Sequence, residues 1–326
     1  MNIIIFGGCG FIGSHVVDLL HANPSNQLFI FDDLSTGKLE NIRHLISTKH
    51  NTRIRFEMLD VKKREHVDDA FCRFRPEVVI LLAAQAAISK SESDPNFDAD
   101  TNIGGMLNVI RAAKQFSARR IVFSSTSAVY REKRWGKLKE TDFCQPKSPY
   151  GISKLAAEHY LRSLFPVSMI LRFGNVYGPR QTPIGENQVI PRMIRHFKFG
   201  DDFKIFGDGK QTRDYVYVED VAEAVQAAMT GWCGTYNIAT GRRLSVTQVA
   251  EGIESLFDVP GYKWEHREQP DARRDICLDV RAAEEHLNWK SEVSFMEGLK
   301  RTAEWWNEPQ EAPTLVKMNL AYEEVW

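Results

Sequence analysis

The stretch IIIFGGCGFIGSHVVDLL, residues 3–20, decides the fold of this 326-residue chain. Its apolar start predicts a buried strand, four glycines follow, and the remaining residues have the periodicity of an amphipathic helix. Glycines let the backbone turn tightly and approach a pyrophosphate, while the N-terminus of a helix offers N–H groups and a positive dipole. The stretch therefore predicts a strand, a loop and a helix that bind a dinucleotide cofactor through Gly7, Gly10, Phe11, Ile12 and Gly13.

Apolar runs and amphipathic helix patterns alternate through the first half of the chain. The later runs are QLFIFDD (27–33), IRFEMLD (54–60), PEVVILLAA (76–84), RRIVFSS (119–125) and VSMILRFGN (167–175). Nearly continuous apolar strands that alternate with helices predict a parallel sheet covered on both faces. Right-handed crossovers then give a doubly wound α/β sheet of the Rossmann type. We expect this dinucleotide-binding domain to span residues 1–173.

After residue 175 the alternation ends and the chain becomes rich in proline, glycine and asparagine. Helix patterns at 192–200 and 245–257, with short strand patterns at 203–207 and 215–218, predict a smaller α+β lobe. We expect this lobe and a C-terminal tail to occupy residues 174–326, with residues 215–240 returning to the first domain.

The composition argues against several classes of protein. A net charge of −1 argues against a nucleic-acid-binding surface, and 43% hydrophobic residues support a folded core. The five cysteines are far apart, odd in number and without a CxxC pair, so neither a metal site nor a disulfide framework is indicated. The N-terminal apolar run is too short for a signal peptide or a membrane span. We therefore expect a soluble cytoplasmic protein with reduced thiols.

Acidic and small residues at the ends of later strands extend the predicted cofactor site. Asp32 lies 19 residues after Gly13, where a carboxylate accepts hydrogen bonds from the adenosine ribose. A carboxylate there repels a 2′-phosphate, so NAD is favoured over NADP. Asp33 can share this task, and Asp60, at the end of the third strand, can reach the adenine. The expected cofactor site also includes Ser35, Val61, Leu82, Ala83 and Ala84.

A strand end rich in hydroxyls and a tyrosine–lysine pair carry the predicted chemistry. Four hydroxyls, at residues 124–127, follow the fifth apolar run, and ligands bind beyond the carboxyl ends of parallel strands. In SPYGISKLAAEHYL (148–161), Tyr150 and Lys154 stand four residues apart, which places them on one helix face. A lysine ammonium stabilises a nearby phenolate, so such a tyrosine can take a proton from an alcohol and return it. Alone, the pair is compatible with two surface residues; the glycine loop and the hydroxyl cluster favour acid–base chemistry.

Together these segments resemble the extended short-chain dehydrogenase/reductases, and among them the nucleotide-sugar epimerases and dehydratases. The resemblance spans roughly residues 1–305 and rests on GGCGFIGSH (7–15), SSTSAVY (124–130), SPYGISKLAAE (148–158), LRFGNVYGPRQ (171–181) and FGDGKQTRDYVYVEDVAEAV (206–225). It implies that Tyr150 is the acid/base and that Lys154 also binds the nicotinamide ribose. It further implies that Thr126, with Ser125 as its neighbour, hydrogen-bonds the reacting hydroxyl, and that Asn102 lies near the cofactor or the active-site helix.

The second lobe resembles a clamp for the nucleotide half of a nucleotide sugar. The contacts that this resemblance implies are Asn175 with the diphosphate, Asn187, Gln188 and Val189 along the nucleotide, Phe206 at the base, and Arg213 and Arg274 on the diphosphate. Arginine suits this role because its planar guanidinium binds phosphate oxygens bidentately. Ile276 aligns with a gatekeeper that is a tyrosine in enzymes restricted to glucose and galactose. Gly174 is expected to leave room near the nicotinamide.

The residues after the threonine narrow the expected reaction. Dehydratases and decarboxylases of the group typically carry an acidic residue there, whereas this chain has Ser127 and Ala128. We therefore predict an NAD-dependent 4-epimerase of UDP-glucose and UDP-galactose, or of their N-acetylated counterparts, that oxidises carbon 4 transiently. The alternatives are a UDP-glucuronate 4-epimerase, a nucleotide-sugar dehydratase or decarboxylase, and a non-catalytic dinucleotide-binding protein. The resemblance also implies a homodimer formed through helices at 103–116 and 150–164.

Overall fold

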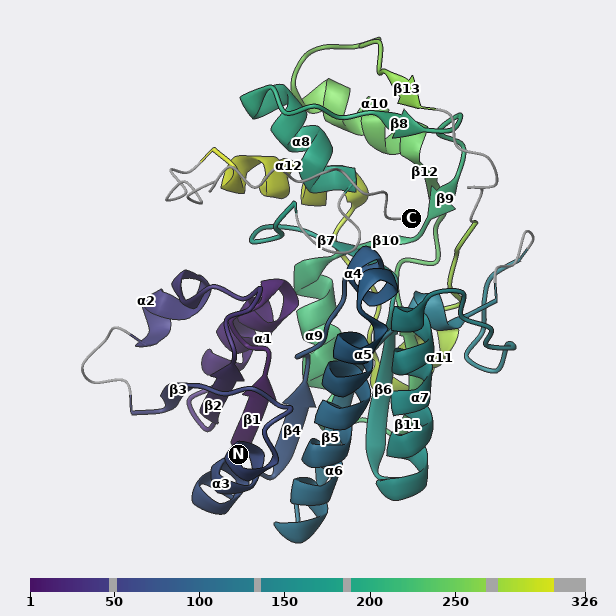
Figure 1. The fold of residues 1–326 in the computed structure, drawn as a ribbon. Helices are drawn as coiled ribbons and strands as arrows, with labels where there is room; N and C mark the ends of the chain where they lie inside the picture. The colour runs from purple at the N-terminus through teal and green to yellow at the C-terminus, as the bar shows by residue number, and fades with distance from the viewer. Residues whose placement is uncertain (47–51, 132–135, 184–188, 268–274, 308–326) are drawn as a thin grey trace.

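A seven-stranded parallel sheet forms the centre of the molecule (Figure 1). The computed structural model describes residues 1–46, 52–131, 136–183, 189–267 and 275–307. The strands run in the order β11-β6-β5-β4-β1-β2-β3. They are β1 (Asn2–Phe6), β2 (Gln27–Asp32), β3 (Ile54–Met58), β4 (Val78–Leu81), β5 (Arg120–Thr126), β6 (Ser168–Phe173) and β11 (Gly234–Ile238). Every neighbouring pair is parallel, so the predicted doubly wound α/β sheet is confirmed.

Alternate residues of each strand face opposite layers of helices, because successive side chains on a strand point to opposite faces. Ile3 and Ile5 belong to the core shared with α1, α9 and α11, whereas Ile4 and Phe6 belong to the core shared with α3, α6 and α7. These helices are α1 (Phe11–His21), α3 (Arg64–Phe74), α6 (Gly105–Gln115), α7 (Pro149–Leu164), α9 (Val218–Ala228) and α11 (Arg281–Leu287). Because both faces of the sheet are buried, its strands are continuous apolar runs in the sequence.

Short helices fill the connections around the sheet. They are α2 (Arg43–Ile46), α4 (Ile88–Ser93), α5 (Pro95–Ala99), the 3-10 turns η1 (Leu39–Ile42) and η3 (Ser127–Val129), and the π-helical turn η2 (Asp100–Gly104). The π-helical turn leads directly into α6, and π-helical turns frequently occur at functional sites. Among the helices that the structure describes, none has the length and apolar character needed to cross a membrane.

A smaller lobe covers the carboxyl ends of the strands (Figure 1). Its helices are α8 (Val189–Phe199), α10 (Val246–Leu256) and α12 (Phe295–Trp305). Its strand pairs are β7 (Asn175–Tyr177) with β10 (Tyr215–Tyr217), β9 (Thr212–Arg213) with β12 (Leu244–Ser245), and β8 (Ile205–Phe206) with β13 (His266–Arg267). Helix α10 starts at a reciprocal capping box formed by Ser245 and Gln248.

The region 215–240 contributes to both parts of the molecule. Strand β11 completes the central sheet beside β6, and α9 packs against α1. Strand β10 pairs instead with β7 in the lobe. The division of the chain into two domains at residue 173 stays a prediction.

Candidate active site

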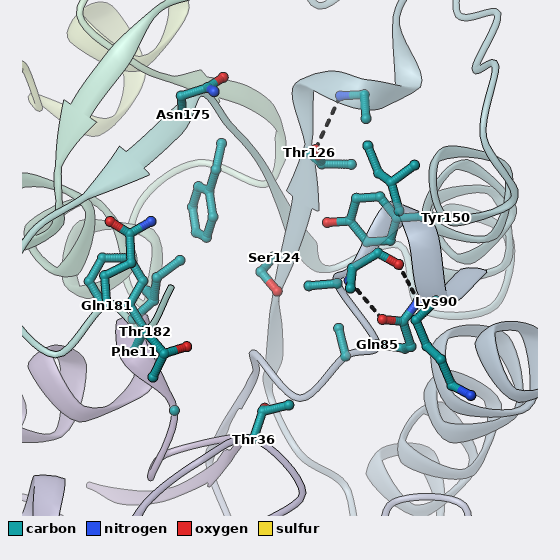
Figure 2. Close-up of a pocket in the computed structure, with 18 of the residues that line it drawn as sticks. Phe11, Thr36, Gln85, Lys90, Ser124, Thr126, Tyr150, Asn175, Gln181 and Thr182 are labelled. Atoms are coloured by element: carbon teal, nitrogen blue, oxygen red, sulfur yellow. Dashed lines mark hydrogen bonds between the residues drawn. The ribbon is translucent and has the colours of Figure 1, made fainter. Parts of the chain in front are cut away.

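A cavity of about 890 Å³ lies between the central sheet and the smaller lobe (Figure 2). Residues that follow or end β1, β2, β4 and β5 line it from one side, and residues of α8, β8, β9 and β13 line it from the other. The strand order changes direction between β1 and β4, and doubly wound sheets bind their ligands at such a point. The volume is typical of a ligand site, for which about 300–1,000 Å³ is usual.

The glycine turn after β1 has no room for a side chain at Gly7 or at Gly13. Gly7 has a φ of +83°, and a Cβ there would lie 2.5 Å from the Ala83 nitrogen. A Cβ on Gly13 would collide with the Gly7 carbonyl oxygen. Every residue predicted in this turn lines the cavity, namely Gly7, Gly10, Phe11, Ile12 and Gly13. Since α1 begins at Phe11, the turn brings a helix N-terminus to the cavity, and the N–H groups there suit a pyrophosphate.

A buried carboxylate lies beside the glycine turn at the end of β2. The Asp32 oxygens accept hydrogen bonds from the Cys9 and Leu34 nitrogens, each at 2.9 Å. Burial raises the pKa of Asp32, and these N–H groups oppose the rise. A carboxylate has about four lone-pair positions, so Asp32 can also accept ribose hydroxyls. Asp33 and Ser35 line the cavity too, with the Ser35 hydroxyl 2.6 Å from Asp33 Oδ1.

Two residues predicted for the cofactor do not line the cavity. Asp60 accepts a hydrogen bond from the Lys62 nitrogen at 2.9 Å in the turn after β3. Asn102 is buried behind the wall, where its side chain donates to the Gln85 carbonyl oxygen and to Ser153 Oγ, each at 3.0 Å. Asn102 therefore lies against α7, which is the second of its two predicted places, and connects the segment after β4 to that helix. The remaining predicted residues of this wall do line the cavity; they are Val61, Leu82, Ala83 and Ala84.

These features fit a dinucleotide. The turn admits a ligand close to the backbone because its glycines carry no Cβ atoms, the helix N-terminus suits phosphates, and Asp32 suits a ribose. Ala83 and Ala84 line the cavity with small side chains, and Ala83 lies beside Gly7 of the turn.

Tyr150 and Thr126 lie on the same side of the cavity (Figure 2), and Lys154 lines it as well. Helix α7 starts after Ser148, whose side chain accepts a hydrogen bond from the Gly151 nitrogen at 3.2 Å. A Cβ on Gly151 would lie 2.7 Å from the Ala128 carbonyl oxygen, so this glycine lets α7 begin close to the turn that follows β5. The packing explains why a tyrosine in the first turn of a helix is 5% exposed.

Lys154 is buried one helical turn after the tyrosine. It is 2% exposed, and its Nζ lies 4.4 Å from the centroid of the Phe123 ring on β5. A cation over an aromatic face is stabilised by the ring quadrupole, which helps to hold the ammonium inside the protein. The i, i+4 spacing seen in the sequence therefore brings both side chains to the cavity.

The hydroxyls at the end of β5 point to different partners. Ser124 donates to the Leu81 carbonyl oxygen at 3.1 Å, and Ser125 donates to Glu158 Oε1 at 2.5 Å. Thr126 Oγ1 accepts a hydrogen bond from the Ala128 nitrogen at 3.1 Å and keeps its own hydrogen as a donor (Figure 2). Thr126 is therefore better placed than Ser125 to bond a ligand hydroxyl.

The lobe supplies the other wall of the cavity. Five of the predicted substrate contacts line it: Asn175, Val189, Phe206, Arg213 and Ile276. Three others, Asn187, Gln188 and Arg274, lie outside the described residues. The prediction for Gly174 is wrong, because this residue does not line the cavity. A Cβ there would point at the Asp214 carbonyl oxygen, 2.7 Å away, so Gly174 serves close backbone packing.

Several residues of this wall were missed in the sequence. Gln181 and Thr182 line the cavity after the turn at Pro179, and Figure 2 shows both near Phe11. Three further arginines also line it, namely Arg180, Arg192 and Arg267. The Arg192 guanidinium lies 5.3 Å from the Phe203 ring, and that of Arg267 lies 5.8 Å from the Phe206 ring. The segment NVYGPRQ (175–181) contains Arg180 and Gln181 and offered a signal for them, whereas Thr182, Arg192 and Arg267 lie outside that segment.

The cavity can hold a dinucleotide next to a second ligand that carries a hydroxyl group. The side chains at the end of β5 and the start of α7 can transfer a proton, and the arginines of the lobe can bind phosphates. Across the residues with described positions, no three or more His, Cys, Asp or Glu side chains are grouped so as to hold a metal ion.

Comparison with known proteins finds similarity over most of the chain. Residues 3–239 match the NAD-dependent epimerase/dehydratase family. A UDP-glucose 4-epimerase of Mycolicibacterium smegmatis is 33% identical over 312 residues, which cover 94% of this chain and 98% of that protein. The structure of the Thermotoga maritima UDP-glucose 4-epimerase with UDP-glucose has a TM-score of 0.86 and 36% identity, covering 94% of this chain and 98% of that one. The Thermus thermophilus UDP-glucose 4-epimerase, solved with NAD, has a TM-score of 0.85 and 34% identity, covering 95% and 100%.

Proposed function

Because the chain belongs to the NAD-dependent epimerase/dehydratase family, we propose that it is an NAD-dependent 4-epimerase of a UDP-hexose. The observation that carries this proposal is the meeting of Tyr150, Lys154 and Thr126 in one cavity, opposite a turn that fits a dinucleotide. The relatives from Mycolicibacterium smegmatis, Thermotoga maritima and Thermus thermophilus bear the name UDP-glucose 4-epimerase, which supports UDP-glucose and UDP-galactose as substrates.

The side chains of this chain divide the work between binding and proton transfer. When bound, NAD supplies a hydride acceptor for carbon 4 and, once reduced, a hydride donor. Tyr150 takes the proton of the 4-hydroxyl and returns it, Lys154 stabilises the phenolate, and Thr126 donates a hydrogen bond to the sugar oxygen. The glycine turn and Asp32 hold the dinucleotide. The substrate diphosphate and base are assigned to the lobe residues Asn175, Phe206, Arg213, Arg192 and Arg267.

The turn after β5 favours epimerisation over elimination of water or loss of carbon dioxide. Ser127 and Ala128 both line the cavity, and neither carries a carboxylate. A base near carbon 5 would be needed for dehydration, whereas 4-epimerisation needs only the acid/base at carbon 4. The ketone has to turn over in the pocket so that hydride returns to its opposite face.

Product analysis by NMR tests the proposal directly. The purified protein is incubated separately with UDP-glucose, UDP-N-acetylglucosamine and UDP-glucuronate. We expect conversion of UDP-glucose into UDP-galactose without added cofactor, because a cofactor that is regenerated in every cycle can stay bound. Conversion of UDP-glucuronate alone would identify that sugar nucleotide as the substrate. A product that has lost water or carbon dioxide would identify the protein as a dehydratase or a decarboxylase instead of an epimerase. No conversion of any of the three would refute the epimerase.

We also infer that two copies of the chain associate through α6 and α7. The outward face of α7 presents Ile152, Tyr160 and Leu164, which are 54%, 44% and 36% exposed. Such an apolar face is typical of an interaction surface. Tyr160→Glu should halve the mass measured by light scattering. A monomeric protein before substitution would contradict this inference.

The cytoplasmic location stays a prediction. It is supported by the five free cysteines, two of which, Cys72 and Cys233, are exposed thiols suited to a reducing compartment.

A further inference from the structure

Glu158 is a fully buried carboxylate on α7, the helix that carries the proposed acid/base. Three side chains donate hydrogen bonds to it. Ser125 Oγ lies 2.5 Å from Oε1, Arg172 donates through Nε at 2.9 Å and through Nη2 at 2.7 Å, and Arg162 Nη2 lies 2.6 Å from Oε2. The proton transfer proposed above does not use this carboxylate, so its burial calls for another explanation.

The helical repeat puts this carboxylate on the face of α7 that carries the chemistry. Tyr150, Lys154 and Glu158 are four residues apart, so they form one stripe facing the sheet. Ser125 directly precedes Thr126 on β5. The bond between Glu158 and Ser125 therefore joins helix and strand one residue away from the hydroxyl proposed to hold the sugar.

Arg172 anchors the carboxylate to the sheet. In the strand register, Ser125 of β5, Arg172 of β6 and Asn237 of β11 are direct neighbours. The Arg172 guanidinium lies 4.7 Å from the Tyr130 ring, whose hydroxyl donates to Asn237 at 2.6 Å. Glu158 is thus held by residues of two adjacent strands, and its partner Arg172 packs on a ring that is bonded to a third strand.

The charge of Glu158 is maintained by these contacts. Burial alone would raise the pKa of the carboxyl, but the hydrogen bonds and charge of Arg172, followed by the hydrogen bond from Ser125 and the charge of Arg162, hold the pKa below its ordinary value. A buried ion pair is a poor source of stability, because the loss of hydration offsets the attraction. Its bonds are directional, however, and the bidentate pair with Arg172 permits one geometry.

We propose that Glu158 is a positioning residue, which sets the place of Tyr150 and Lys154 relative to Thr126 by bonding Ser125 and Arg172. The inference rests on the proposed function, since it assigns Glu158 a task in that reaction. Removal of the carboxylate lets α7 shift against β5. A misplacement of about 1 Å between reacting groups can lower a rate about 100-fold.

The test compares Glu158→Gln with the matched control Arg162→Gln, in proteins that retain their cofactor. The control removes only the partner whose side chain is 39% exposed and leaves Ser125 and Arg172 in place. We expect Glu158→Gln to lower kcat on UDP-glucose by about 10- to 100-fold with KM within about threefold, because binding groups of the lobe are untouched. Glu158→Asp should restore part of kcat, and the control should stay within about twofold of the original protein.

A second readout does not depend on turnover. Amide hydrogen exchange at 148–154 should be faster in Glu158→Gln than in the original protein, and unchanged in the control. If the glutamine variant does not fold, Ser125→Ala, which keeps the ion pair, should show the same faster exchange. Wild-type kcat per folded molecule, or unchanged exchange at 148–154, would overturn the positioning role. If the original protein is inactive but amide exchange at 148–154 is faster in the variant, the proposed epimerase activity is refuted, whereas the positioning of α7 by Glu158 is not.

Discussion

Replacing His15 by glutamine should make the stability of this protein less sensitive to acid. His15 lies on α1, is 8% exposed, and has its Nε2 3.0 Å from the Pro179 carbonyl oxygen. A carbonyl oxygen only accepts, so Nε2 carries the hydrogen and Nδ1 is the unprotonated nitrogen of the neutral ring. Burial, followed by the charge of Arg180, lowers the pKa of His15 from 6.5 to about 4.

The size of the effect follows from that pKa. Between pH 6.5 and about 4 the unfolded chain binds a proton at this position that the folded protein does not bind. The stability that depends on neutral His15 is therefore fully present above pH 6.5, falls progressively below that pH, and is lost once the pH has fallen through the folded-state pKa of about 4. One pKa unit corresponds to about 1.4 kcal/mol, so the loss reaches about 2 kcal/mol near pH 5 and about 3 kcal/mol when complete.

Urea titrations measure this difference. The free energy of unfolding is determined at about pH 7.5 and about pH 5 for the original protein, His15→Gln and His15→Leu. Between about pH 7.5 and about pH 5, the free energy of unfolding of each variant should fall by about 2 kcal/mol less than that of the original protein. Other buried acids, such as Asp220 with a pKa raised to about 6, change all three proteins alike and cancel in the comparison.

The two variants provide the control. Glutamine can still donate to Pro179, whereas leucine cannot, so their stabilities near neutral pH should differ. The stability that each variant gains relative to the original protein on acidification should nevertheless be equal, because neither glutamine nor leucine titrates. If the original protein and both variants lose the same free energy between the two pH values, the neutral buried imidazole is refuted. A gain confined to one variant would assign the effect to packing.

Three further predictions concern the cavity. Tyr150→Phe should lower kcat by about 10²- to 10⁴-fold while NAD stays bound, as judged by the cofactor content of the purified protein. Retained turnover would show that Tyr150 is not the acid/base. Asp32→Ala should weaken the binding of NAD and strengthen the binding of NADP, as measured by calorimetry, because the carboxylate no longer repels a 2′-phosphate. An unchanged preference between the two cofactors would mean that Asp32 bonds only the backbone N–H groups and not the ribose. Ile276→Tyr should selectively reduce turnover of UDP-N-acetylglucosamine, because the larger ring fills space that an N-acetyl group needs. Equal loss on UDP-glucose would contradict the gatekeeper alignment.

The sheet and one side of the cavity were predictable because they depend on local patterns. Each predicted strand of the first half is present, since a strand buried on both faces must be apolar at nearly every position. The glycine turn was readable because only residues without a Cβ fit beside Ala83. Tyr150 and Lys154 could be paired because the helical repeat alone brings residues four apart to one face.

The other site residues could not be predicted, because their places depend on contacts between segments that are distant in the sequence. Asp60 and Asn102 stand at plausible places in the sequence, but the turn after β3 and the packing of η2 against α7 direct their side chains away from the cavity. Gly174 looked like space for a ligand, although its missing Cβ accommodates the backbone at Asp214. His15 and Glu158 lie in segments that carry the family resemblance, but their roles could not be read from the sequence, because their partners Pro179 and Arg172 are 164 and 14 residues away in the chain.

The sequence by itself determined the doubly wound sheet, the dinucleotide turn and the helix with its tyrosine and lysine, because periodicity, glycine geometry and strand ends are local properties. Only the tertiary structure decided which hydroxyl at the end of β5 remains a donor toward the cavity, and which residues of the lobe close over it. It also decided that a buried carboxylate ties α7 to β5. These features depend on side chains from distant segments, and their directions are set when the helices and the lobe pack against the sheet.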